Sequence, residues 1–134
     1  MNVARLRHTA TTLGDGRVLI AGGGRGLDSA ETYDAATDSF TALAGTLRGG
    51  RGGHSASVLS DGRVFLAGGE GPSGERADVE FFDPAQNAFA RLLPLSPSIQ
   101  NTQAVVLADG RLLLLGGSSG GQAQGSIFAY RPLD

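Results

Sequence analysis

Hydrophobic and polar positions along the chain repeat as short strand-like runs. Three apolar runs, each followed by a Gly-Gly doublet, lie at residues 18–21, 64–67 and 112–115, and each comes directly after the tripeptide Asp-Gly-Arg. The tripeptides begin at Asp15, Asp61 and Asp109, so the spacings are 46 and 48 residues. No segment keeps the periodicity of a helix, and glycine interrupts nearly every stretch. The pattern predicts an all-β chain made of three repeated units.

Each unit is predicted to form up to four strands. The first is a tract of β-branched and small residues at 8–13, 54–59 and 102–107, and the Asp-Gly pair after it predicts a two-residue hairpin turn. The second is the apolar run, which is apolar on both faces and should be buried on both sides. The third lies at 30–34, 79–83 and 126–131, and the fourth carries Phe40 or Phe89.

The third unit departs from this plan at its end. Alignment places the units at 1–46, 47–94 and 95–134, forming a single repeat array. Phe40 and Phe89 each stand seven residues after the matching aromatic of the third strand, and the same step from Tyr130 leads past Asp134. We therefore expect eleven strands, with the last unit lacking its outermost strand.

Composition narrows the class of protein. The chain has 134 residues, a net charge of −2 and 40% hydrophobic residues, which is too apolar for a disordered chain. The charge argues against a general nucleic-acid surface, and no transmembrane segment or signal peptide is visible, which slightly favours the cytoplasm and leaves the compartment open. All 11 basic residues are arginine, a bias typical of a GC-rich bacterial genome.

The repeated pattern resembles the kelch repeat, in the bacterial form also seen in galactose-oxidase-like propellers. Its elements recur at equivalent places in the units: Arg5 and Arg51, His8 and His54, the Asp-Gly-Arg turns, the doublets Gly22-Gly23, Gly68-Gly69 and Gly116-Gly117, and Glu31 and Glu80. The resemblance covers essentially the whole chain. It implies a kelch-type β-propeller with about three four-stranded blades per chain.

The chain also departs from the kelch pattern. Phe40 and Phe89 stand where the family usually has tryptophan in the fourth strand. In the third unit, three positions that carry arginine, histidine and glutamate elsewhere are occupied by Ile99, Thr102 and Phe128.

Three blades are too few to close a ring, because propellers have about four to eight. The first and last blades would each expose an apolar face. Two explanations stay open: a homodimer around a two-fold axis makes a closed six-bladed propeller, or a longer chain supplies the remaining blades.

The resemblance implies that Arg5 and Arg51 lie near the mouth of the central channel, where arginines of some family members bind acidic peptides or polar ligands. Ile99 breaks this set. The alternative is that both arginines bond to loop backbone.

The other recurrent polar residues favour structural roles. His8 and His54, the only histidines, recur with the repeat and therefore favour structural hydrogen bonding over catalysis. Glu31 and Glu80 are expected to accept backbone N–H bonds or to pair with an arginine, and so to hold a loop in place.

No motif for catalysis is evident. The chain has no cysteine, which excludes thiolate metal sites and the cysteine-linked tyrosine of a galactose-oxidase-type copper centre. It has no Ser-His-Asp or metal-ligand spacing, so we expect no enzymatic activity, metal or cofactor. The tract 48–53 resembles an RNA-binding arginine-glycine box, but it is one short copy at a unit boundary.

These features favour a non-catalytic binding or interaction module whose partners are a second copy and a peptide or small polar ligand, with no nucleic acid or membrane involved. One alternative is a structural fragment of the propeller of a larger secreted galactose-oxidase-like protein. Another is a self-assembling half-propeller without a ligand. Ligand choice should depend on the loops at 24–29, 70–77 and 118–125.

Overall fold

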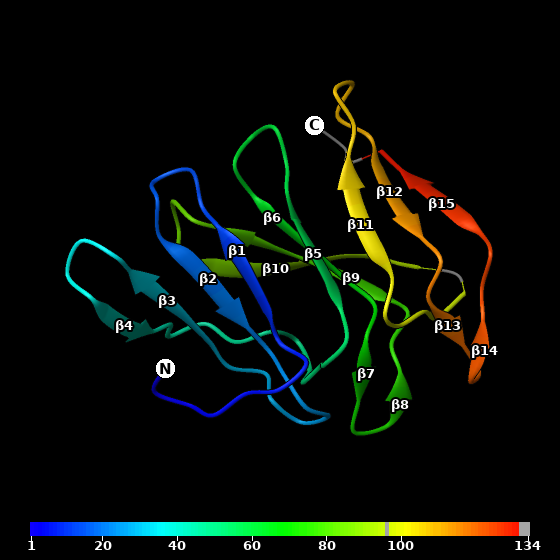
Figure 1. Cartoon of the computed structure of the whole chain (residues 1–134), viewed down its shortest axis with the longest axis horizontal. Coiled ribbons are helices and arrows are strands. Elements are labelled where there is room, and N and C mark those ends of the chain that lie inside the picture. The colour runs from blue at the N-terminus through cyan, green and yellow to red at the C-terminus, as the bar shows by residue number, and fades with distance from the viewer. Residues whose placement is uncertain (96, 132–134) are drawn as a thin grey trace.

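Every regular element of the computed structural model, which describes residues 1–95 and 97–131, is a β-strand. The first sheet has the order β1-β2-β3-β4: β1 (Thr9–Thr12), β2 (Val18–Ala21), β3 (Ala30–Asp34) and β4 (Ser39–Ala42). The second has the order β5-β6-β9-β10: β5 (Ser55–Val58), β6 (Val64–Ala67), β9 (Asp78–Asp83) and β10 (Ala88–Pro94). The third has the order β11-β12-β15: β11 (Gln103–Val106), β12 (Leu112–Leu115) and β15 (Ile127–Tyr130). The predicted all-β class is confirmed (Figure 1).

The structure has a strand in each of the eleven predicted runs, and all pairings within the sheets are antiparallel. The third sheet has three strands within 97–131; a fourth strand in this unit would involve residues outside the described part. Two small hairpins were not predicted: β7 (Glu70–Gly71) with β8 (Gly74–Glu75), and β13 (Ser118–Ser119) with β14 (Gln122–Ala123). Both lie in loops on which ligand choice is expected to depend.

The predicted two-residue turn at Asp-Gly is wrong. The Leu13 N–H donates to the Arg17 carbonyl at 2.7 Å and the Gly16 N–H donates to the Leu13 carbonyl at 3.0 Å, so the loop has three residues. Gly16 has a φ of 88°, and a three-residue hairpin loop needs such a residue at this place. Asp15 instead accepts the Arg17 N–H at 3.0 Å, which caps the turn from its side chain.

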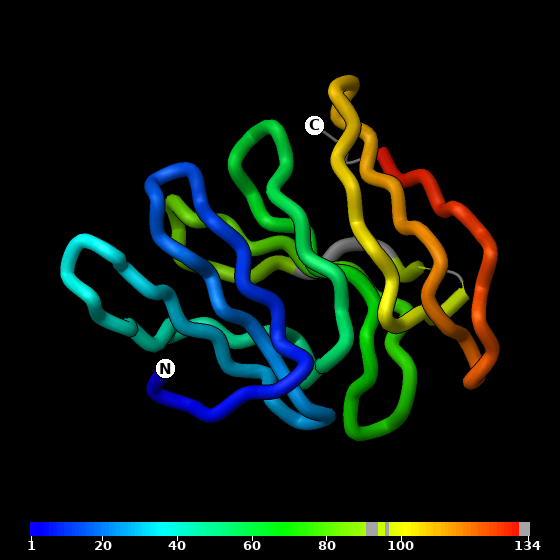
Figure 2. The backbone as a smooth tube through the Cα atoms, in the orientation of Figure 1, coloured from blue at the N-terminus to red at the C-terminus, as the bar shows by residue number. Residues whose placement is uncertain are grey.

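The sheets stand side by side so that their first strands β1, β5 and β11 are neighbours (Figures 1 and 2). Two apolar layers fill the spaces between sheets. The first layer is centred on Leu19, Leu66 and Phe82, and the second on Phe65, Phe81 and Leu114. Each sheet therefore buries a face against its neighbour.

The predicted burial of the second strands holds fully for β6, whose four residues are each 0% exposed. β12 alternates between buried and half-buried residues instead. Among the described residues, no sheet packs on the outer face of β12, whereas β6 belongs to the middle sheet. Position alone does not decide burial, because β2 of the other outer sheet has three buried residues, Leu19–Ala21.

Candidate functional site

Arg5 and Glu31 form a buried pair that joins the first linker to the first sheet. The Arg5 Nε donates to Glu31 Oε1 at 3.2 Å, and both side chains are 1% exposed. The Arg5 Nη1 donates to the Gly22 and Ser29 carbonyls, each at 2.8 Å, and the Nη2 donates to the Ser29 hydroxyl at 3.0 Å. Arg5 thus bonds to loop backbone and to a carboxylate at the same time.

Arg51 occupies the same place in the second unit and is completely buried. Its Nη2 contacts Glu80 in a short ion pair and Asp78 Oδ2 at 3.2 Å, and its Nη1 donates to the Gly68 carbonyl at 3.2 Å. Burial lowers the pKa of Arg51, with the nearby carboxylates opposing that shift; an arginine nevertheless remains charged. Its Nε finds no partner among the described residues.

Glu31 and Glu80 also accept a backbone N–H from the linker before their sheet. The Asn2 N–H donates to Glu31 at 2.8 Å, and the Arg48 N–H donates to Glu80 at 2.8 Å. Burial raises the pKa of Glu31, but the bonds from Asn2 and Arg5 outweigh it and bring the pKa below its ordinary value. Both glutamates therefore lie where a loop-holding role requires them.

The third unit replaces this polar pair with apolar residues. Ile99 is 1% exposed at the position of the two arginines. Phe128, at the position of the glutamates, packs against the second apolar layer. Replacing the arginine and the glutamate together avoids leaving one buried charge unpaired, which would lower the stability of the fold.

Contact of Arg5 and Arg51 with a ligand stays a prediction. In this conformation both guanidinium groups are held by carboxylates and carbonyls. A ligand could reach them only if they left these partners.

His54 connects two neighbouring sheets through one hydrogen bond. Its Nε2 lies 2.8 Å from Thr9 Oγ1 in β1. Burial, and then the electrostatic effects of Arg51 and of His8, lower the pKa of His54 to about 3. His54 is therefore neutral at pH 7. Like His8, it has a buried Nδ1 without a partner among the described residues.

The Gly-Gly doublets allow the linkers to approach the sheets. Gly22 and Gly68 have φ values of 65° and 63°, and a Cβ on either would collide with the carbonyl of Arg51 or Ile99. The second glycine of each doublet binds the same linker, because the Gly23 N–H donates to the Arg51 carbonyl at 2.8 Å and the Gly69 N–H donates to the Ile99 carbonyl at 2.9 Å.

A further group of polar side chains lies beside the β7–β8 hairpin, at the end of the sheets where the first strands begin. We call it the loop-end cluster: Arg7, Arg25, Glu70, Glu75, Gln100 and Asn101. The carboxylate of Glu70 bridges two arginines, with distances of 3.1 Å to Arg7 Nη1 and 3.0 Å to Arg25 Nη2. Arg7 Nη2 donates to Gln100 Oε1 at 3.3 Å.

Arg7 has an unusual backbone. Its φ is 58°, and the equivalent residues of the next two units, Gly53 and Asn101, have φ values of 64° and 54°. Glycine and asparagine adopt this left-handed conformation readily, whereas it costs other residues about 1 kcal/mol. The Arg7 side chain is 36% exposed, so its guanidinium is accessible where those of Arg5 and Arg51 are not.

Sequence reasoning missed Arg7 because it is one of the two variable residues between the recurrent Arg5 and His8. A signal was nevertheless present: positions 7, 53 and 101 align, and two of the three carry residues that favour the left-handed conformation.

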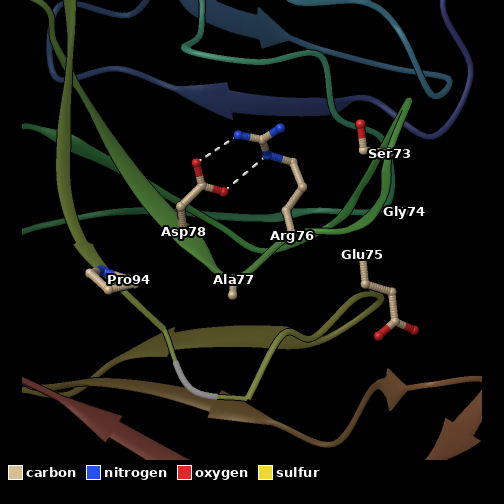
Figure 3. A pocket seen from close by; sticks show the side chains of 7 residues that line it. All are labelled: Ser73, Gly74, Glu75, Arg76, Ala77, Asp78 and Pro94. Atoms are coloured by element: carbon tan, nitrogen blue, oxygen red, sulfur yellow. Dashed lines mark hydrogen bonds and ion pairs between the residues drawn. The ribbon is translucent and has the colours of Figure 1, made fainter.

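Described residues line a pocket at each end of the second sheet. One, of about 280 Å³, is lined by residues 73–78 and Pro94 (Figure 3). Most of its lining therefore comes from the loop 70–77, one of those on which ligand choice is expected to depend. In it Arg76 binds Asp78 with two bonds, of 3.0 and 2.7 Å. The other pocket, of about 260 Å³, includes Asp15, Asp61 and Asp83.

Within 1–95 and 97–131, no group of three or more histidine or acidic side chains is placed to hold a metal ion, and no helix is long and apolar enough to cross a bilayer. No model of a known protein family matches the chain, and no curated protein matches it significantly.

Proposed function

We propose that the chain is a non-catalytic binding module built from kelch-type propeller blades. A second copy completes its ring to six blades, and its ligand contacts the loop-end cluster. The fanned arrangement of the sheets around β1, β5 and β11, with equivalent registers in successive sheets, supports the propeller. A rigid β scaffold that presents variable loops at one end is a common way to build a binding site.

The strained, accessible Arg7 is the observation that carries the binding site. A left-handed arginine lowers stability, and the second unit uses Gly53 at the same position without that cost. Strained residues that persist are concentrated at functional sites. Arg7 is also beside residues of the second and third units, Glu70 and Gln100, so a ligand there would touch several units.

The chemistry of the cluster favours a ligand with a carboxylate, such as an acidic peptide. Glu70 already bridges Arg7 and Arg25, which demonstrates that a carboxylate fits between the two guanidinium groups. Arginine binds carboxylates with two parallel bonds. A ligand carboxylate can therefore compete with Glu70 for these donors, while the amides of Gln100 and Asn101 offer further hydrogen bonds.

Thermal shift with a hexa-aspartate peptide, citrate and inorganic phosphate tests this site. We expect the peptide to raise the melting temperature, since a ligand that binds only the folded state stabilises it. The shift should disappear in Arg7→Gln and persist in Arg111→Gln, a matched variant at the hairpin end of the third sheet, where Arg111 pairs with Asp109. Equal shifts in both variants, or none with any probe in the native chain, would refute the site.

Two alternatives rest on the same sheets. Further blades of a longer chain could cover the outer faces, as in the propeller of a larger secreted galactose-oxidase-like protein; extra blade sequences next to this reading frame would favour that origin. A half-propeller without a ligand would dimerise and yet respond to none of the three probes.

A further inference from the structure

The two junctions between sheets in this chain use the same backbone contacts. At the first junction the Gly23 N–H donates to the Arg51 carbonyl at 2.8 Å, and at the second the Gly69 N–H donates to the Ile99 carbonyl at 2.9 Å. The donors Gly23 and Gly69 have Gly117 as their counterpart in the third unit. The acceptors Arg51 and Ile99 have Arg5 as their counterpart in the first unit. Each linker therefore binds the preceding sheet through an equivalent backbone hydrogen bond.

A second series of backbone bonds connects the starts of the first strands. The Gly53 N–H donates to the Arg7 carbonyl at 2.9 Å, and the Asn101 N–H donates to the Gly53 carbonyl at 2.8 Å. The series has complementary ends, because its next bond would join the Asn101 carbonyl to an Arg7 N–H.

Side chains repeat at the junctions as well. Thr9 in β1 bonds to His54, and Ser55 in β5 bonds to Thr102. By alignment, the residue that follows in this series is Gln103 in β11, and its partner would be the residue equivalent to His54 and Thr102 in a following unit. In this chain that residue is His8.

The outer faces of the first and third sheets match the faces already packed inside the chain. Leu66 faces the first sheet and is 0% exposed. Its counterpart Ile20 lies on the outer face of the first sheet and is 6% exposed. Leu47 is 2% exposed between two sheets, whereas its counterpart Met1 is 53% exposed. On the outer face of the third sheet, Ile127 is 67% exposed, whereas its counterpart Val79 is 0% exposed.

Gly116 is the counterpart of Gly22 and Gly68, the two glycines against which the linkers pack. Its φ of 64° is close to those of Gly22 and Gly68, 65° and 63°. A Cβ on those two would strike the linker carbonyl, but at Gly116 the nearest atom would be the Gln124 carbonyl oxygen at 3.6 Å.

We infer that the third sheet of one copy packs against the first sheet of a second copy in the register of the two internal junctions. This inference rests on the proposed function and names the surfaces that complete the ring. The contact occurs twice around a two-fold axis, so three sheets from each copy close at six, within the known range of propellers.

The junction also completes the loop-end surface. In the closed ring, Asn101 of one copy lies next to Arg7 of the other, and the two Arg7 residues lie on opposite sides of the axis. Both copies would then contribute to one channel mouth.

Engineered cysteines test the junction, because the native chain has none. The double variant His8→Cys/Gln103→Cys should form a covalent dimer under mild oxidation, seen on a non-reducing gel, while each single variant should not. Ser55→Cys/Thr102→Cys is the matched control, since these hydroxyls touch within one chain and should give an internal disulfide. If the control closes and the double variant stays uncrosslinked, the junction is wrong.

Light scattering provides an independent test. The native chain should have twice the chain mass of 13.6 kDa, and Ile127→Glu, on an exposed position, should halve the measured mass without unfolding the chain. A monomeric native chain overturns the dimer itself. A native dimer that survives Ile127→Glu overturns only this junction, and loss of the peptide response in a crosslinked dimer overturns only the binding site.

Discussion

Arg51 and Glu80 form an ion pair in which neither side chain is exposed. The pair joins the linker before the second sheet to β9, and Asp78 on the same strand also binds the arginine. Arg5 and Glu31 repeat the arrangement in the first sheet. The stability of each four-stranded sheet therefore depends on a buried charge that keeps its partner.

Removing one member of this pair should be severely destabilising. We expect Glu80→Ala to lower the free energy of unfolding by about 3–5 kcal/mol, because it leaves a buried guanidinium short of one partner. Urea denaturation at a fixed chain concentration measures the loss. Glu70→Ala, which breaks the more exposed pair with Arg7, should cost about 1 kcal/mol or less; similar losses in the two variants would contradict this account.

The third unit suggests a double substitution that replaces both members of the buried pair. Ile99 and Phe128 occupy the equivalent positions there, so Arg51→Ile combined with Glu80→Phe should be less destabilising than Glu80→Ala alone. Exchanging both members of a buried pair for apolar residues avoids the unpaired charge. A loss larger than that of the single variant would contradict the argument.

Substituting two neighbouring leucines of β12 with alanine should lower the free energy of unfolding by different amounts. Leu114 is 1% exposed in the layer between the second and third sheets, and Leu114→Ala should cost about 2–5 kcal/mol. Leu113 is only half-buried and points to the outer face, so Leu113→Ala should cost far less in the folding of a single chain. Denaturation at concentrations low enough to separate any dimer compares the two, and equal costs would show that the outer face is not open.

His54 should make stability depend on pH. Its pKa is about 3 in the folded chain, against 6.5 ordinarily, so the unfolded chain binds more protons between these values. The contribution is complete above pH 6.5 and is lost as pH falls from there toward 3, at up to about 1.4 kcal/mol per pH unit.

Urea denaturation between pH 7 and pH 5 measures this slope above the range in which carboxylates titrate. His54→Gln should flatten it, whereas a slope unchanged by that substitution would assign the dependence to another group.

Much of the fold could be predicted from local pattern. The apolar run 64–67 and its counterparts became second strands because alternating and apolar runs bounded by glycine favour strands. The two-residue turn was predicted wrongly, because Leu13 and Arg17 form the closing pair, and sequence alone does not reveal which pair closes a hairpin. The hairpins β7–β8 and β13–β14 were missed because two-residue strands leave no periodicity to detect.

The site was less predictable than the fold. The repeat identified Arg5 and Arg51, but the structure buries both against glutamates on β3 and β9, and it leaves accessible an arginine that no motif marked. Arg7 is two residues from Arg5, and its φ of 58° turns it away from the path that a β-strand would follow.

The sequence by itself determined the strands, the three units and the all-β class, since these depend on short-range alternation, turn residues and repetition. Only the tertiary structure decided which charges are buried and which are accessible, because Arg51 meets Glu80 across 29 residues and Arg7 meets Gln100 across 93. The tertiary structure also decided that, within residues 1–95 and 97–131, the middle sheet has a neighbouring sheet on both sides and the first and third sheets have one on a single side. Burial depends on what packs against a residue, and no local pattern records that.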